Sequence, residues 1–183
     1  PTADDLKWET EGYVYGLYSG SGVTLRSVPY ENYPDTETAV GTLDGEVTVI
    51  AYTTNYYGEK WLVTDEGDWV KESDVTKIED MMPFALSDDV NYPEKLHLSY
   101  TSCKLYGTVT SLSGDIKTVN GGIFDAEGNR VYGTTVTVDA ATFNISKIDD
   151  YIAFRNLGAG EYYYRVIAEN ACGTYDVINY AFT

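Results

Sequence analysis

Apolar and polar residues alternate with a period of two along most of this chain, which is the pattern of β-strands with one buried face. The longest such stretch is Glu161–Asn170, and Val47–Tyr52 is the clearest one in the first half. No stretch repeats its apolar residues with the helical period of about 3.6 residues. The pattern therefore predicts an all-β protein.

Turn-forming residues divide the first half into short predicted strands. Ser19–Gly22 predicts one turn and Asp44–Glu46 predicts another, because glycine and its polar neighbours favour turns. Pro29–Thr38 is a longer predicted loop, and Asn55–Glu59 is a predicted hairpin loop that ends near a glycine. We expect separate strands on either side of each of these segments.

Two tryptophans lie in neighbouring predicted strands at the end of this half. Trp61 and Trp69 each occupy a short strand, and an acidic turn with Gly67 joins the two strands. We expect residues 13–78 to form a small barrel that closes over these two indoles.

The alternation resumes after residue 95, in strands spaced roughly 8–12 residues apart with turn residues between them. In the longest strand, alternation places four apolar residues on one face, namely Tyr162, Tyr164, Val166 and Ala168. We expect residues 95–183 to form a β-sandwich. Residues 79–94 are the predicted linker, because Pro83, Pro93 and several carboxylates argue against an internal strand.

The charge of the chain excludes several classes of partner. It carries 29 Asp and Glu against 12 Lys and Arg, a net charge of −17. A surface this acidic repels phosphate backbones and anionic lipids, so we expect no nucleic-acid partner. No apolar run approaches the roughly 20 residues of a membrane span, so we expect no membrane insertion either.

Two cysteines, Cys103 and Cys172, both lie in the second half of the chain. They can form a disulfide across the second predicted domain or remain two unpaired thiols. The sequence leaves both alternatives open.

The sequence argues against catalysis. His97 is the only histidine, and its alternating strand context favours cross-strand packing over a Cys–His nucleophile pair or a zinc site. Paired acids for glycoside hydrolysis need a cleft, and two small β domains offer little room for one. We expect no catalytic residues, no metal site and no cofactor.

An ordered set of residues in the first half resembles the bacterial SH3-like (SH3b) domains. The set consists of Val23, Leu25, Arg26, Ser27, Pro29, Gly45, Trp61, Val63, Gly67, Trp69 and Val70. The chain departs from the family at Val28, where a glycine is usual, and in the long loop after it. The resemblance implies a small barrel that attaches secreted proteins to cell-wall peptides or glycans and has no catalytic activity of its own.

The second half resembles the immunoglobulin and fibronectin type III sandwiches. Phe154, Leu157, a glycine corner and the Y-x-Y-x-V-x-A run of the longest strand carry this likeness. It implies an architecture and not a function, since sandwiches host many roles.

Aromatic residues beside loops are the candidate ligand contacts. In SH3-like barrels the two loops concerned lie along one groove, so the resemblance brings their tyrosines together. Aromatic faces stack on sugar rings or peptide side chains, and nearby acids meet amines. The predicted ligand-binding residues are Tyr30, Tyr33, Tyr56, Tyr57, Glu59 and Trp61.

These observations predict a non-catalytic module that binds a peptidoglycan peptide or glycan, in a protein that is secreted and extracellular or associated with the cell wall. Such a module can be the targeting part of a longer wall hydrolase. The alternative is a surface adhesion module that binds a protein or a host glycan. The sequence does not predict the oligomeric state.

Overall fold

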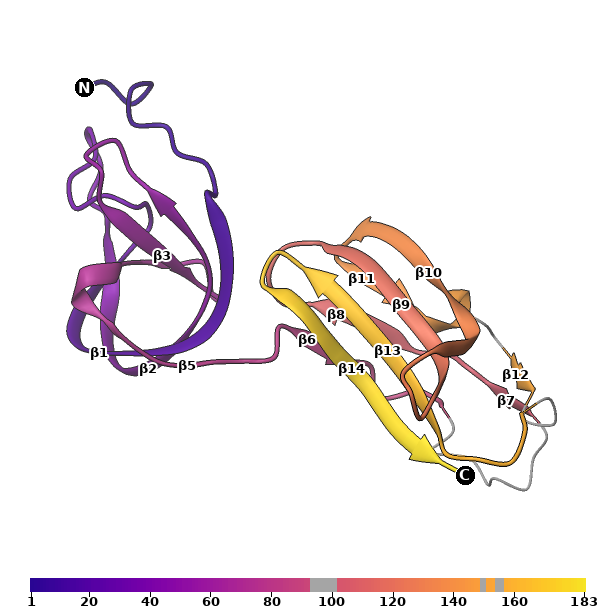
Figure 1. Ribbon diagram of the computed structural model, residues 1–183. Coiled ribbons are helices and arrows are strands. Elements are labelled where there is room, and N and C mark those ends of the chain that lie inside the picture. The colour runs from indigo at the N-terminus through magenta and orange to yellow at the C-terminus, as the bar shows by residue number, and fades with distance from the viewer. Residues whose placement is uncertain (93–101, 149–150, 154–156) are drawn as a thin grey trace. The chain divides into compact units, whose positions relative to one another are not determined.

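The computed structural model describes residues 1–92, 102–148, 151–153 and 157–183, with only the backbone described at 102–104 and 151–153 (Figure 1). Within these residues all regular structure is β-strand except two short 3-10 helices, Glu72–Asp74 (η1) and Ile145–Lys147 (η3). Neither is long and apolar enough to cross a membrane. The predicted all-β fold is confirmed.

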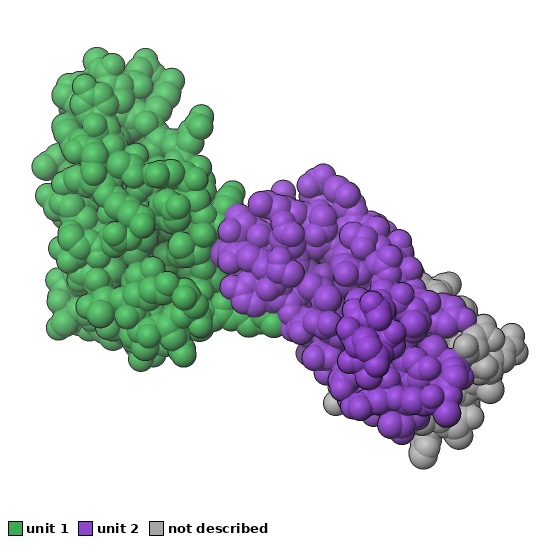
Figure 2. Space-filling model, viewed as in Figure 1, with its two compact units in different colours: residues 1–82 green, residues 83–183 purple. Residues whose placement is uncertain are grey.

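The chain divides into two compact units, residues 1–82 (unit 1) and 83–183 (unit 2), which Figure 2 shows in separate colours. The predicted linker at 79–94 is not free of strands. Thr76–Asp80 (β5) runs into it from unit 1, and Phe84–Leu86 (β6) lies inside it as part of unit 2. Pro83 directly precedes β6, a position where the missing N–H of proline costs no ladder bond.

Unit 1 is a closed barrel built on two long strands, Gly12–Arg26 (β1) and Ala39–Thr54 (β2). β2 pairs with Lys60–Thr64 (β3), which pairs with Trp69–Lys71 (β4), and β4 returns to the end of β1. Because β1 also pairs with β2 along its length, the ring of strands closes, and β5 adds to β1.

Both predicted turns of the first half lie inside strands, which corrects the sequence-based expectation. β1 continues through Ser19–Gly22 and β2 through Asp44–Glu46, with Gly20 paired to Gly45. The register shifts just after Gly20, so the two strands bend together there. A Cβ on Gly20 would lie 2.8 Å from Val23 Cγ2, so any larger residue at this position would displace the Val23 side chain. These turn-type residues curve the barrel wall instead of reversing the chain.

The barrel interior holds residues that alternate with the tryptophans. Leu62 and Val70 pack inside with Tyr18, Val23, Leu43 and Val49. Trp61 pairs with Lys71 and Trp69 with Val63, so both indoles share the outer face of the β3–β4 hairpin. The two strands are antiparallel neighbours as predicted, but the barrel does not close over the indoles. Other parts of unit 1 cover them from outside.

Unit 2 is a β-sandwich. One sheet contains Arg130–Ala140 (β10), Ile116–Asp125 (β9), Tyr162–Asn170 (β13) and Gly173–Phe182 (β14) in that order. The other contains Thr142–Asn144 (β11), Thr108–Ser111 (β8) and β6. Side chains of both sheets form a single core, to which β13 contributes Tyr164, Val166 and Ala168 from the predicted face.

The two cysteines lie on different parts of unit 2. Cys172 is a free thiol in the turn between β13 and β14. Cys103 lies on Ser102–Lys104 (β7), which pairs with Tyr151–Ala153 (β12) at the opposite end of the unit (Figure 1). The side chain of Cys103 lies outside the described residues, so the possible disulfide with Cys172 stays a prediction, as does the alternative of two unpaired thiols.

Candidate binding site

The most exposed aromatic side chains of unit 1 lie on the hairpin between β2 and β3. Tyr56 is 61% exposed and Tyr57 is 57% exposed, and both were predicted ligand contacts. Their ring centroids are 5.4 Å apart and the rings are perpendicular. One ring can therefore stack on a flat ligand surface while the other borders it.

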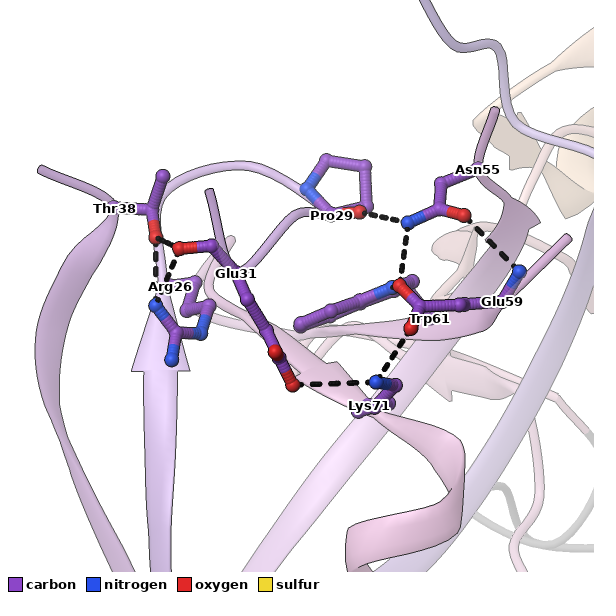
Figure 3. Close-up of polar contacts among 8 residues, drawn as sticks. All are labelled: Arg26, Pro29, Glu31, Thr38, Asn55, Glu59, Trp61 and Lys71. Carbon is purple, nitrogen blue, oxygen red and sulfur yellow. Dashed lines mark hydrogen bonds and ion pairs between the residues drawn. The ribbon is translucent and has the colours of Figure 1, made fainter. Parts of the chain in front are cut away.

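The side chain of Asn55 holds this hairpin in place by its contacts with Pro29 and Glu59 (Figure 3). Its side-chain amide donates to the carbonyl oxygen of Pro29 at 2.9 Å and to Glu59 Oε2 at 3.0 Å. Its Oδ1 accepts the backbone N–H groups of Tyr57 and Glu59, both at 3.0 Å. The residue is buried, so the four bonds fix the shape of the hairpin and join it to the loop that begins at Pro29.

Tyr30, a predicted ligand contact, is only 1% exposed and cannot present a face to a ligand. Its hydroxyl accepts the backbone N–H of Tyr56 at 3.0 Å, and its ring contacts Tyr57 at a centroid distance of 6.1 Å. The ring also contacts Trp8 and Tyr33, at 6.2 and 5.8 Å. Tyr30 is therefore buried and packs against the more exposed rings. It is buried because segments distant in the sequence, those of Trp8 and Tyr57, pack around it.

Trp8 belongs to the site although it was not among the predicted ligand contacts. It is half-buried, its ring lies 6.4 Å from that of Tyr33 and 6.4 Å from that of Trp69, and with Lys7 and Glu9 it lines a cavity of about 500 Å³. A large aromatic residue within a polar, acidic segment was its only signal in the sequence. Four partly or fully exposed rings, those of Trp8, Tyr33, Tyr56 and Tyr57, together form what we call the aromatic surface.

Glu59 and Trp61, the other predicted ligand contacts, interact instead with side chains of the protein itself. Lys71 Nζ lies 2.6 Å from Glu59 Oε1 and 3.2 Å from Glu31 Oε1 (Figure 3). The indole N–H of Trp61 donates to Glu59 Oε2 at 3.4 Å, and Trp61 is 1% exposed. The hydrogen bond from Lys71 lowers the pKa of Glu59, and the bond to Glu59 raises the pKa of Lys71. Lys71 therefore supplies the amine that Glu59 was expected to contact in a ligand.

The aromatic side chains gathered here suit ligand binding. Among the described residues, no three or more His, Cys, Asp and Glu side chains gather where they could hold a metal ion. His97 lies outside the described residues.

Comparisons with models of protein families, with curated proteins and with solved structures give no match to this chain. The side chains of the site and their contacts are therefore the basis for inferring its function.

Proposed function

We propose that unit 1 is a non-catalytic module that binds a peptide or glycan of the bacterial cell wall through the aromatic surface. The observation that carries this proposal is the pair Tyr56 and Tyr57, which are more than half exposed on a hairpin fixed by a buried asparagine. Fixed aromatic rings bind sugar faces and peptide side chains at a low cost in conformational entropy. The ordered residues shared with SH3-like domains of cell-wall proteins support the same function.

The charge of unit 1 indicates which wall component fits. Residues 1–82 carry 5 Lys and Arg against 17 Asp and Glu, a net charge of −12. This field repels phosphate-rich wall polymers and attracts ligands that carry amines. Peptidoglycan stem peptides carry such amines, so peptidoglycan is the better candidate.

Co-sedimentation with purified peptidoglycan tests the proposal. We expect the protein to pellet with the polymer, and Tyr56→Ala combined with Tyr57→Ala to weaken the apparent affinity about tenfold or more, because truncating central aromatic contacts typically costs over 1 kcal/mol each. Tyr13→Ala is the matched control, since Tyr13 is a tyrosine of unit 1 that is 42% exposed and has no part in the aromatic surface.

Two results would count against peptidoglycan binding through this surface: a protein that stays in the supernatant, or a double variant that pellets like the wild type. Binding instead to an arrayed protein or host glycan, again lost in the double variant, would favour the adhesion alternative.

A further inference from the structure

Unit 1 contains a second cleft, separate from the aromatic surface. It has a volume of about 400 Å³, which is within the usual range of roughly 300–1,000 Å³ for small-molecule sites. Residues 21–24 of β1 form one side, and Trp61 also lines it. The remaining lining side chains are charged, namely Arg26, Glu31 and Asp74.

Arg26 differs from every other cationic side chain of unit 1. The four lysines each form an ion pair with a carboxylate: Lys7 with Asp4, Lys60 with Glu72, Lys71 with Glu31 and Glu59, and Lys77 with Asp80. Within residues 1–82, all of which the structure describes, the guanidinium of Arg26 has no such partner. No carboxylate of unit 1 therefore lies within ion-pairing distance of this guanidinium.

The bonds that Arg26 does make position it for a ligand. Its Nη1 donates to the carbonyl oxygen of Glu31 at 3.1 Å and to Thr38 Oγ1 at 2.7 Å (Figure 3). The Thr38 hydroxyl in turn donates to the same carbonyl oxygen at 3.0 Å. Both groups that accept these bonds are uncharged, and both bonds are donated by Nη1. The Nη2 and Nε edge keeps the geometry that binds a carboxylate through two parallel hydrogen bonds.

Negative charge lines the same cleft. Glu31 shares the single ammonium group of Lys71 with Glu59, so this group of three side chains keeps one net negative charge. Asp74, in η1, is exposed and forms no ion pair within the described unit 1. An anion alone would be repelled by the net charge of −12, whereas a ligand with an ammonium group has a second attractive contact here.

We propose that this cleft binds a short zwitterionic peptide, with the terminal carboxylate against Arg26 and the terminal ammonium group toward Glu31 and Asp74. The inference goes beyond the proposed function, because the cleft and the aromatic surface have no residue in common. Either one can bind its ligand if the other does not.

Titration of the full chain with three peptides, followed by calorimetry or by amide chemical shifts, tests the proposal. We expect trialanine to bind, and both N-acetyltrialanine and trialanine amide to bind about tenfold more weakly, since each lacks one charged end. Arg26→Gln should bind trialanine and its amide equally. Asp74→Asn should reduce the preference for trialanine over the N-acetyl peptide.

Two controls keep these outcomes interpretable. Glu79→Gln changes an exposed acid that does not line the cleft, and it should keep all three affinities. Tyr56→Ala with Tyr57→Ala should also bind trialanine like the wild type, which separates this inference from the proposed function. Arg26 also bonds to the loop at Glu31 and Thr38, so the fold of its variant is first checked by the amide spectrum. The exposed side chain of Asp74 forms no ion pair within the described unit 1, so Asp74→Asn provides the second test.

The proposal is overturned if trialanine fails to bind at about 10 mM, where even a millimolar site would be mostly filled. It is overturned equally if the three peptides bind alike, or if both variants keep the full wild-type discrimination between free and blocked ends.

Discussion

Asn55 is the residue on which the geometry of the aromatic surface depends most. It has no exposed face to offer a ligand, yet its side chain bonds to the backbone N–H groups of Tyr57 and Glu59 and to the neighbouring loop at Pro29. A buried amide with all of these partners fixes position, because any displacement leaves several buried polar groups unpaired. Asn55 therefore fixes the backbone of the hairpin that carries the two exposed tyrosines.

Replacing Asn55 by alanine should therefore destabilise unit 1 by about 2–4 kcal/mol, because it leaves the Pro29 carbonyl and two backbone N–H groups without their partner. Urea denaturation measures this change. Asn32→Ala is the control, since Asn32 is exposed in the adjoining loop and its loss should cost less than about 0.5 kcal/mol. Equal effects of the two substitutions would show that Asn55 does not organise the hairpin.

The ion pair between Glu59 and Lys71 predicts a pH dependence on the acid side. The pKa of Glu59 is lowered from its ordinary value of 4.5, chiefly by the hydrogen bond from Lys71. The unfolded state therefore takes up the proton at a higher pH than the folded state, so the pair stabilises above pH 4.5 and this stabilisation is lost as pH falls through the folded pKa. Glu59→Gln should flatten this part of the stability–pH curve measured by urea denaturation. An unchanged curve would mean that the pair contributes nothing to folding.

The sequence could predict which types of residue lie at this site but not how deeply each of them is buried. Tyr56 and Tyr57 are exposed beside a turn, as their positions suggested. Tyr30 and Trp61 are buried because partners far along the chain, such as Trp8 for Tyr30 and Lys71 for Trp61, lie against them. Burial of that kind depends on tertiary contacts that a local pattern does not contain.

At the scale of elements, the period-two pattern predicted the strands well and their ends poorly. Glycine-containing segments that suggested turns lie within β1 and β2, because Gly20 faces Gly45 across the pair and the two strands bend as one. The same alternation predicted correctly that the tryptophans occupy adjacent antiparallel strands. It could not show which face of the hairpin turns inward, since Leu62 and Val70 are as apolar as their neighbours.

The segment that precedes β1 acts as a cover for the outer face of β4. Trp8 contacts Trp69 and the two tyrosines of the loop. Trp8→Ala should therefore expose Trp69 to water, shift the tryptophan emission to longer wavelength and lower the free energy of unfolding by about 1–2 kcal/mol. Trp8→Phe, which removes the indole but keeps a ring in place, should leave the emission maximum of the remaining tryptophans unchanged.

If the alanine variant shows the same emission maximum as the phenylalanine variant, Trp69 is covered by something other than Trp8. The predicted contribution of this segment to the aromatic surface would then be wrong.

At the scale of the whole molecule, the two units differ in the features that matter for binding. Unit 1 carries most of the net charge, −12 of −17, and it contains the aromatic surface and the cleft lined by Arg26, Glu31 and Asp74. Unit 2 is a sandwich, and the face of β13 that carries Tyr164, Val166 and Ala168 belongs to its core. The alternation and its interruptions predicted an all-β chain in two parts. They could not place the boundary at residues 82 and 83, because this boundary depends on the pairing of β6 with β8.

The most direct test of the proposed binding surface is the amide spectrum of the full chain, recorded while soluble peptidoglycan fragments are added. We predict that the signals of residues 55–59 and of Trp8 and Tyr33 shift progressively, while those of unit 2 stay in place. Shifts confined to unit 2, or a spectrum of unit 1 that remains unchanged at saturating fragment, would contradict the assignment of binding to the aromatic surface.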